Sequence, residues 1–579
     1  MARKCAILTL LLGFAHCNDG IVASPTGPSA PLPDVEVASR SPNAFRIFNA
    51  VHSALRQWGS SIQHNGLSFF PVTIPEGNLF YHGRHDTERP ETFEWLAFEM
   101  EHASQFAQCW DFDDPSPSTS MLSQCFKLVQ GLSVHGRVAT ADPKVRPSSG
   151  FGRHRGTTIP DDDDDDQHAL TGDDDDDNLE LPPSGRRPRP PKARGYLQTY
   201  RAARPLNLLY LDGMAAAKCR LGTLDSQNSI LLDWTEEADP MRDEWERTEA
   251  LCALARSWGG VDGFVRMEAG FEIIYCNFTR GAGLDLISTR GSPFRNETHA
   301  SAGEGEGGEW FVMGVLEWMR ASAARYGGFP RARAEVDFSG MVSAFMYDVN
   351  TTNPDPERQD LPRIVSTGAD ARHGIRDRVR ESVRARKGKA SSTIEWQAVV
   401  DNIVTRFAAR LWFLSENPPS ARPFRSQLAT LLYPFLDFPD DISLDDVSEP
   451  VQRCTEIHLS PVVTAGQSSW TPEDRAIHAA IRTVSHEICS SLFAMRREIH
   501  TTNGTTSGDD DAARRVQGMA RELRGRLDWT AWKECARCAE PEEMCFVAMF
   551  PAGDREDHFA PRCKRQDEIG FGYFVDVRW

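Results

Sequence analysis

The 579-residue chain lacks long apolar segments and lacks a surplus of positive charge. Beyond its first residues, no stretch reaches the roughly 18 consecutive apolar residues that mark a membrane-spanning helix. The formal net charge is −19, with eleven acids in two aspartate runs, so no basic surface for nucleic acid is expected. We therefore expect a soluble chain with no nucleic-acid partner and no transmembrane segment after signal removal.

The usual signatures of several enzyme classes are also missing. The sequence contains no HExxH zinc-protease motif, no GxSxG nucleophile elbow and no P-loop. One formal GxGxxG match, at residues 303–308, follows a polar stretch rather than a strand. Glu304 and Glu306 within it would repel a pyrophosphate, so we interpret it as loop composition.

An export signal opens the chain. Arg3 and Lys4 precede an apolar run from Cys5 to Phe14, and small residues suited to cleavage follow at Ala15 and Ala23. Residues 1–23 are therefore predicted to be a signal peptide, and the protein is predicted to be secreted. Four glycosylation sequons support a secreted glycoprotein; they begin at Asn277, Asn296, Asn350 and Asn503.

Thirteen cysteines are encoded, and secretion decides how we interpret them. Four of them form a C-terminal group: Cys535, Cys538, Cys545 and Cys563. In a cytosolic protein this group would suggest zinc, but in an oxidising compartment it favours disulfide bonds and no metal site. Removal of residues 1–23 would leave eleven cysteines, hence at least one free or intermolecular thiol, whereas cleavage after Ala15 would leave twelve. A local pair, Cys109 and Cys125, is also expected to be bonded.

Composition divides the chain into globular and low-complexity parts. Residues 24–42 are rich in Pro, Ser and Ala and suggest a flexible leader. Residues 140–194 hold the aspartate runs and a basic, proline-rich stretch, which bury too little apolar surface to offset the entropy of ordering. The predicted units are an α+β core at 43–139 and 195–290, a disordered acidic/basic insertion at 140–194, an α/β continuation at 309–349, a polar loop at 350–392 and a helical, cysteine-containing region at 393–579.

Helical periodicity is clearest in the C-terminal region. Apolar residues recur at helical spacing between residues 394 and 411. The stretch from Thr471 to Asp474 supplies an N-cap, a proline at the first helical position and acids in the first turn. A further helix is predicted over residues 512–527.

Short strands dominate the first half. An apolar strand ends in His82-Gly83-Arg84, and a second, at 93–98, carries Trp95 and Phe98. After the insertion, 196–200 and 206–212 are predicted to be paired strands with Pro205 in the turn. A helix at 243–258 and a strand at 270–276, which carries Glu272, complete the pattern.

This order resembles the ADP-ribosyltransferase fold of the His–Tyr–Glu type over residues 75–290. Members often open with a strand that reads aromatic-His-Gly-Thr and end with a strand that bears the catalytic glutamate. The chain also looks like a group of secreted proteins of filamentous fungi. The resemblance implies an α+β fold: an ADP-ribosyltransferase-like mixed/antiparallel β core with a mainly helical C-terminal extension.

The resemblance also implies roles, with NAD as substrate. His82 would hydrogen-bond a ribose hydroxyl, the Gly83 backbone would hold the carboxamide, and Arg84 would meet the pyrophosphate. Trp95 or Phe98 would stack under nicotinamide. The two catalytic residues would be His82 and Glu272. Glu272 would stabilise the positive charge that develops at the sugar carbon.

Departures from the pattern keep a second class of function open. Arg84 stands where threonine is usual, and Trp95 or Phe98 replaces a tyrosine. The first hypothesis is an NAD-consuming transferase or glycohydrolase acting on an unknown protein or small-molecule acceptor. The alternatives are a non-catalytic secreted interaction protein, and a hydrolase with an unrecognised site. The first hypothesis requires His82 and Glu272 to meet at one ribose.

Overall fold

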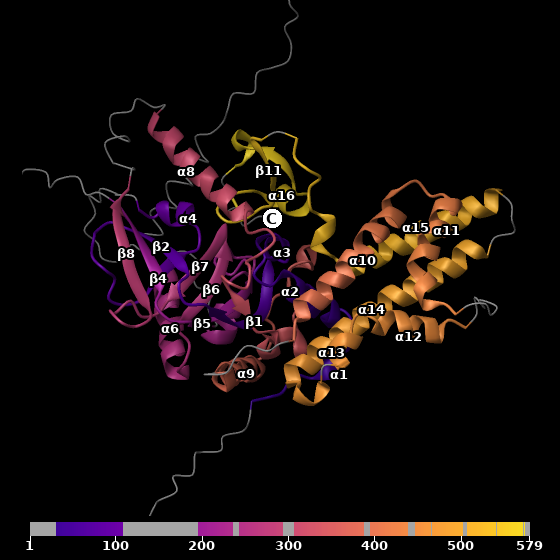
Figure 1. The fold of residues 1–579 in the computed structure, drawn as a ribbon, viewed down its shortest axis with the longest axis horizontal. Helices are drawn as coiled ribbons and strands as arrows, with labels where there is room; N and C mark the ends of the chain where they lie inside the picture. The colour runs from indigo at the N-terminus through magenta and orange to yellow at the C-terminus, as the bar shows by residue number, and fades with distance from the viewer. Residues whose placement is uncertain are drawn as a thin grey trace, which may run out of the picture.

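The computed structural model describes residues 30–107, 195–234, 243–292, 306–386, 394–437, 446–464, 466–501, 506–539, 541–570 and 572–573. Figure 1 shows two parts: a large β-sheet with covering helices, and a group of long helices that extends away from it. The structure is therefore α+β, with a large mixed sheet and a helical C-terminal part.

Ten strands form the large sheet in the described residues, in the order β10-β1-β5-β6-β7-β3-β2-β4-β8, with β9 also paired to β1. Among the described strands, only β5 and β6 run parallel. The strands are β1 (Asn65–Ile74), β2 (Leu79–Arg84), β3 (Glu94–Ala97), β4 (Tyr196–Ala202), β5 (Leu206–Gly213), β6 (Gly263–Glu268), β7 (Gly270–Tyr275), β8 (Leu284–Gly291), β9 (Glu335–Val336) and β10 (Val342–Ser343).

Helices occur along the whole described chain, some against the sheet and others in the helical part. Those of the first half are α1 (Val35–Ser39), α2 (Asn43–Ser53), α3 (Gln57–Ile62), α4 (Met100–Ser104), the π-helix η1 (Ser226–Leu231), α6 (Glu244–Trp258) and α8 (Glu306–Ala323). Those that follow are α9 (Ala369–Arg386), α10 (Trp396–Glu416), α11 (Ala421–Leu432), α12 (Ser448–Glu456), α13 (Ser460–Thr464), α14 (Pro472–His500), α15 (Thr506–Leu527) and α16 (Arg555–Phe559).

The sheet is strongly curled. Residues 203–205 join β4 to β5, although four other strands lie between these two in the sheet. Three linking residues reach about 14 Å at most, whereas five strand spacings in a flat sheet need about 24 Å. The ring of Phe278 lies inside the curl, 5.3 Å from the ring of Tyr200 on β4 and 5.5 Å from that of Tyr275 on β7. The predicted pairing of β4 with β5 is therefore wrong: β4 pairs with β2 and β8.

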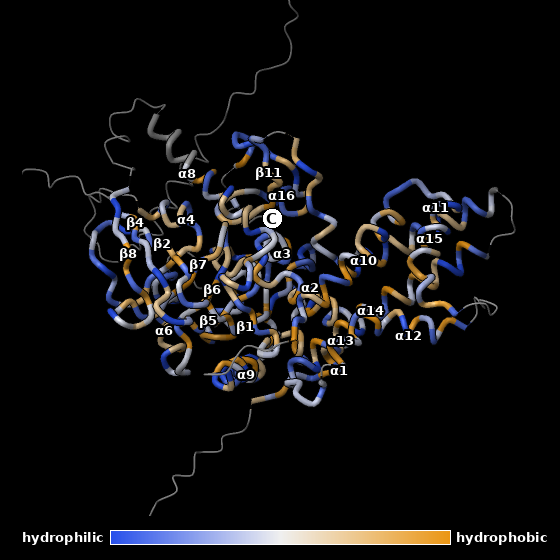
Figure 2. The backbone as a smooth tube through the Cα atoms, in the orientation of Figure 1, coloured by the Kyte–Doolittle hydropathy of each residue, from blue (hydrophilic) through white to orange (hydrophobic). Residues whose placement is uncertain are grey.

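The C-terminal helices follow the predicted periodicity. Helix α14 begins with a capping box between Thr471 and Asp474 and a proline at its first position. The apolar residues that predicted its inner face are all buried: Ile477, Ile481, Val484, Ile488 and Leu492. Figure 2 shows polar and apolar stretches alternating along α10, α14 and α15, as expected for helices that each bury one face.

Two predicted low-complexity segments are ordered in part. Residues 30–42, predicted to be a flexible leader, include α1, whose Val37 and Ala38 are buried. The predicted polar loop at 350–392 contains α9, which buries Ile375 and Val379 one turn apart. Its many arginines concealed this spacing, because several of them are themselves buried or half-buried: Arg372 is buried, and Arg378 and Arg386 pair with acids from other elements. The signal peptide, the 140–194 insertion and the Cys109–Cys125 pair lie outside the described residues.

Four disulfides are present among the described residues. The C-terminal group forms two of them, Cys535–Cys545 and Cys538–Cys563, as predicted. The others are Cys252–Cys276 and Cys454–Cys489, and Cys219 is a buried free thiol. None of the described helices is both long enough and apolar enough to cross a bilayer.

Candidate functional site

The strand that bears Glu272 lies one strand away from the strand that bears His82. Register places Tyr81 of β2 opposite Ala97 of β3, and Ala97 opposite Glu272 of β7. Directly opposed residues share a face of the sheet, and neighbours along a strand point to opposite faces. Glu272 therefore lies on the face of Tyr81 and Ala97, which we call the Glu272 face. His82 lies on the other side, which we call the His82 face.

His82 is enclosed on its own face of the sheet. It is 5% exposed, and its Nδ1–H donates to the backbone oxygen of Trp95 at 2.7 Å. This bond leaves Nε2 as the lone-pair nitrogen, buried and without a partner in the described residues. Burial lowers the pKa of His82 to about 4. The side chain is thus a neutral, interior histidine.

The other residues implied by the resemblance divide between the two faces. Gly83 lies on the Glu272 face, where a Cβ would come within 2.2 Å of the Ala103 oxygen, so its missing side chain admits helix α4. Trp95 lies on the same face. Arg84 lies on the His82 face and pairs with Asp86 at 2.7 Å.

Phe98 also lies on the His82 face. Its amide donates to the Phe271 oxygen, and its ring packs 4.6 Å from that of Phe329 and 5.2 Å from that of Phe80. Phe98 is therefore a core residue. The structure brings Gly83, Trp95 and Glu272 to one face and does not bring His82, Arg84 or Phe98 to it.

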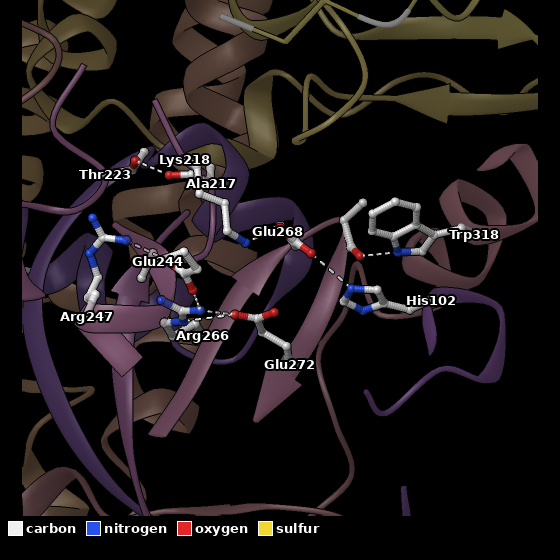
Figure 3. A network of polar contacts seen from close by, with 12 residues as sticks. His102, Ala217, Lys218, Thr223, Glu244, Arg247, Arg266, Glu268, Glu272 and Trp318 are labelled. Atoms are coloured by element: carbon white, nitrogen blue, oxygen red, sulfur yellow. Dashed lines mark hydrogen bonds and ion pairs between the residues drawn. The ribbon is translucent and has the colours of Figure 1, made fainter. Parts of the chain in front are cut away.

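A buried charge network occupies the Glu272 face (Figure 3). Arg266, opposite Glu272 on β6, donates through Nε to Glu272 Oε1 at 2.9 Å. The same guanidinium contacts Glu244 at the start of α6 and donates to Gln227 of η1 at 2.8 Å. Glu244 in turn accepts from Arg247 at 2.6 Å. One strand pair, one α-helix and one π-helix therefore meet at a single guanidinium.

A second branch of the network lies at the end of β6. The Glu268 carboxylate accepts from His102 Nε2 at 3.0 Å and from Lys218 Nζ at 3.2 Å. The His102 ring stacks on Trp318 of α8, 4.7 Å between centroids. The side chains of His102, Lys218 and Glu268 are each 2% exposed. This branch therefore ties α4, β6 and the segment after β5 together out of contact with water.

Opposite charges compensate one another within the network. Burial would raise the pKa of Glu244, but Arg266, Lys218 and Arg247 outweigh it and lower that pKa to about 2. Burial likewise opposes ionisation of Glu268, yet Lys218 and His102 lower its pKa. Burial disfavours the charged form of Lys218 too, and Glu268 foremost raises its pKa. The carboxylates are therefore held ionised by cations already in place.

The network contains the donor set of a metal site. Ligand atoms of His102, Glu268 and Glu272 all lie within 4.8 Å of one another. Lys218 and Arg266 already neutralise the two carboxylates. A divalent cation would have to displace these partners or add positive charge to a desolvated region, which is costly. The arrangement favours a closed ion-pair network over a metal centre.

Sequence reasoning selected Glu272 but missed its partners. Arg266 and Glu268 alternate with Val265 and Met267, a pattern that resembles a strand with one solvated face. In the structure all six residues of β6 are buried. The available signal was that the hairpin sets two acids and one base among large apolar side chains: Arg266 and Glu268 on β6 and Glu272 on β7.

Residues 39–299 match the family model of the YPL277C N-terminal domain. The chain is 26% identical over 569 residues to the Saccharomyces cerevisiae protein YOR389W, named as uncharacterised, covering 87% of this chain and 81% of that protein. It is 30% identical over 255 residues to YPL277C of the same yeast, also named as uncharacterised, covering 42% of each. No solved structure matches the chain.

The matched region contains all the charged residues of the network. Residues 39–299 include both strands of the β6–β7 hairpin, α4 and α6. Similarity to YOR389W runs on into the helical part of the chain. The names of these relatives state no activity.

The buried histidines predict a loss of stability in acid. Burial lowers the pKa values of His52, His64 and His82 to about 4. The unfolded chain takes up these protons near pH 6.5, so stability is lost as pH falls from about 6.5 to 4. Glu94 and Asp212 act in the opposite direction, because burial raises their pKa values to about 7. The stability that they contribute is lost as pH rises from about 4 to 7.

The variant His82→Gln isolates one of these contributions. The free energy of unfolding of the wild type should lose about 2 kcal/mol between pH 7 and pH 5 through His82 alone. Urea unfolding of both proteins at the two pH values measures the difference. An identical pH dependence in His82→Gln would show that His82 is not a buried neutral histidine.

Proposed function

We propose that this chain is a secreted, disulfide-stabilised binding protein that does not consume NAD. One observation carries the proposal: His82 and Glu272 lie on opposite faces of the sheet. A group must contact the reacting ribose to assist the reaction, and a single ribose cannot contact both faces. The ADP-ribosyltransferase resemblance then concerns the order of strands and helices, without the catalytic pair.

The state of Glu272 supports the same conclusion. Its Oε1 is held by Arg266, and its side chain is 7% exposed. A glutamate that stabilises a developing positive charge must direct its own negative charge at the substrate. Here that charge is already compensated by a buried guanidinium. Glu272 therefore acts in this proposal as a structural partner of Arg266.

The Glu272 face also offers a surface for contact with a partner. Trp245 is 43% exposed, and its ring lies 4.7 Å from that of Phe93 and 5.7 Å from that of Trp95. Exposed tryptophan in a rigid aromatic group is common at binding surfaces, because it buries a large area at little entropic cost. Exposed Asn277 and Asn350, the two sequons among described residues, support passage through the secretory pathway.

The second candidate is the NAD-consuming enzyme, and one observation favours it. Glu272 and Trp95 share a face, and no hydrogen bond from the described residues reaches Glu272 Oε2. In this alternative Glu272 would act without His82, and Trp95 would supply the aromatic contact.

Release of nicotinamide from NAD separates the two candidates. The purified mature protein, the variant Glu272→Gln and the control Glu246→Gln, which alters an exposed acid on α6, are incubated with excess NAD. We expect all three to release nicotinamide at the rate of buffer alone. Release that Glu246→Gln retains and Glu272→Gln abolishes would establish the enzyme and reject the binding-protein proposal.

A further inference from the structure

A pocket in the helical part of the chain has no role in the site described above. It has a volume of about 470 Å³ and lies between α10, α11 and the turn after α12. Its lining includes two guanidinium groups, an imidazole, two hydroxyls and an amide, and no carboxylate among the described residues. The polar lining residues are Asn402, Thr405, Arg406, Arg410, Thr430 and His458.

Arg406 is held in place by neutral groups. Its Nη2 donates to the backbone oxygen of Leu431 at 3.2 Å. Its guanidinium carbon lies 5.7 Å from the ring centroids of both Phe407 and Phe435. Its Nε is buried and has no hydrogen-bond partner within the described chain. The side chain is thus positioned without an ion pair to any carboxylate of the described residues.

Arg410 and His458 extend the same pattern. Arg410, one turn further along α10, donates to the side-chain oxygen of Gln427 on α11, another neutral partner. His458 Nε2 is buried and unpartnered in the part of the chain that the structure describes. Burial, and then Arg406, lower the pKa of His458. Two permanent positive charges therefore face one pocket, and neither forms an ion pair with a described carboxylate.

We propose that this pocket binds a phosphate or sulfate group carried by a small organic molecule. Arginine is the preferred ligand for such oxyanions, because its planar group of N–H donors matches two oxygens at once. The hydroxyl and amide groups supply further donors. Pockets of about 300–1,000 Å³ are typical for small molecules rather than bare ions. This site is separate from the Glu272 face and does not depend on the proposed function.

Calorimetric titration with inorganic phosphate, and separately with inorganic sulfate, tests the proposal on the full-length mature protein. Sodium chloride at matched ionic strength is the reference. The variants are Arg410→Gln, His458→Gln and Arg406→Lys. The control is Arg482→Gln. Arg482 is 56% exposed, lies outside the pocket, and has its Nη2 3.8 Å from Glu456 Oε1. Thermal unfolding in chloride shows whether each variant is folded, and the folded pocket variants are the ones compared with the wild type.

Binding of either oxyanion by the wild type should weaken by about tenfold or more in Arg410→Gln, because a charge-assisted hydrogen bond is lost. Arg482→Gln should bind as the wild type does. The tighter of the two oxyanions identifies the group that the natural ligand carries. No binding of phosphate or sulfate, equal binding of chloride, or equal binding by wild type and all pocket variants would overturn the proposal.

Discussion

The variant Arg266→Met should lose about 3–5 kcal/mol of unfolding free energy, because it leaves Glu244 and Glu272 as buried carboxylates without their shared cation. Arg266 is fully buried and contacts both acids. The hydrogen bond to Gln227 of η1 would be lost as well. Urea unfolding followed by tryptophan fluorescence measures the change.

An exposed pair elsewhere on the sheet supplies the control for Arg266→Met. Arg201 of β4 and Asp285 of β8 form an ion pair at 3.0 Å, with side chains 51% and 49% exposed. Arg201→Met should cost no more than about 1 kcal/mol, since solvent screens such pairs. Equal losses in the two variants would show that the charge network does not hold the sheet and helices together.

The double variant Cys252→Ala/Cys276→Ala should lose about 3 kcal/mol, the usual contribution of a disulfide that closes a loop of this length. The two cysteines are 24 residues apart, and their bond ties α6 to the end of β7. Those are the elements that carry Glu244 and Glu272. Loss of the bond should therefore also loosen the network. Hydrogen exchange of the backbone amides of α6 would detect this.

A second disulfide gives the comparison for that variant. Cys535 and Cys545 are 10 residues apart in the C-terminal segment, and their bond joins neither α6 nor β7. Cys535→Ala/Cys545→Ala should leave the exchange of α6 unchanged. If the backbone amides of α6 exchanged equally slowly in both double variants, the Cys252–Cys276 bond would have no special part in positioning Glu244.

Local patterns predicted most elements, because they depend on residues close in sequence. The Thr471–Asp474 capping signal located the start of α14, and short β-rich runs located β2, β3, β5 and β7. What these patterns could not predict was pairing. The three-residue link at 203–205 resembled a hairpin turn, but it crosses between distant strands of a curled sheet.

Which side chains share a face of the sheet could not be predicted for a related reason. The side-chain period of a strand is two, so a shift of one residue moves a side chain to the other face. Tyr81 and His82 are neighbours, yet Tyr81 lies on the Glu272 face and His82 does not. The partners of Glu272 come from β6, α6 and η1, whose approach depends on tertiary packing. Sequence spacing therefore identified the glutamate and could not identify its surroundings.

The central claim is that His82 and Glu272 do not form one NAD site. A crystal structure of the protein grown with NAD tests it most directly. We expect His82 donating to the Trp95 carbonyl inside the curl, Glu272 bound to Arg266 on the opposite face, and no nicotinamide ribose between them. Electron density for a nicotinamide ribose in contact with both His82 and Glu272 would contradict the account.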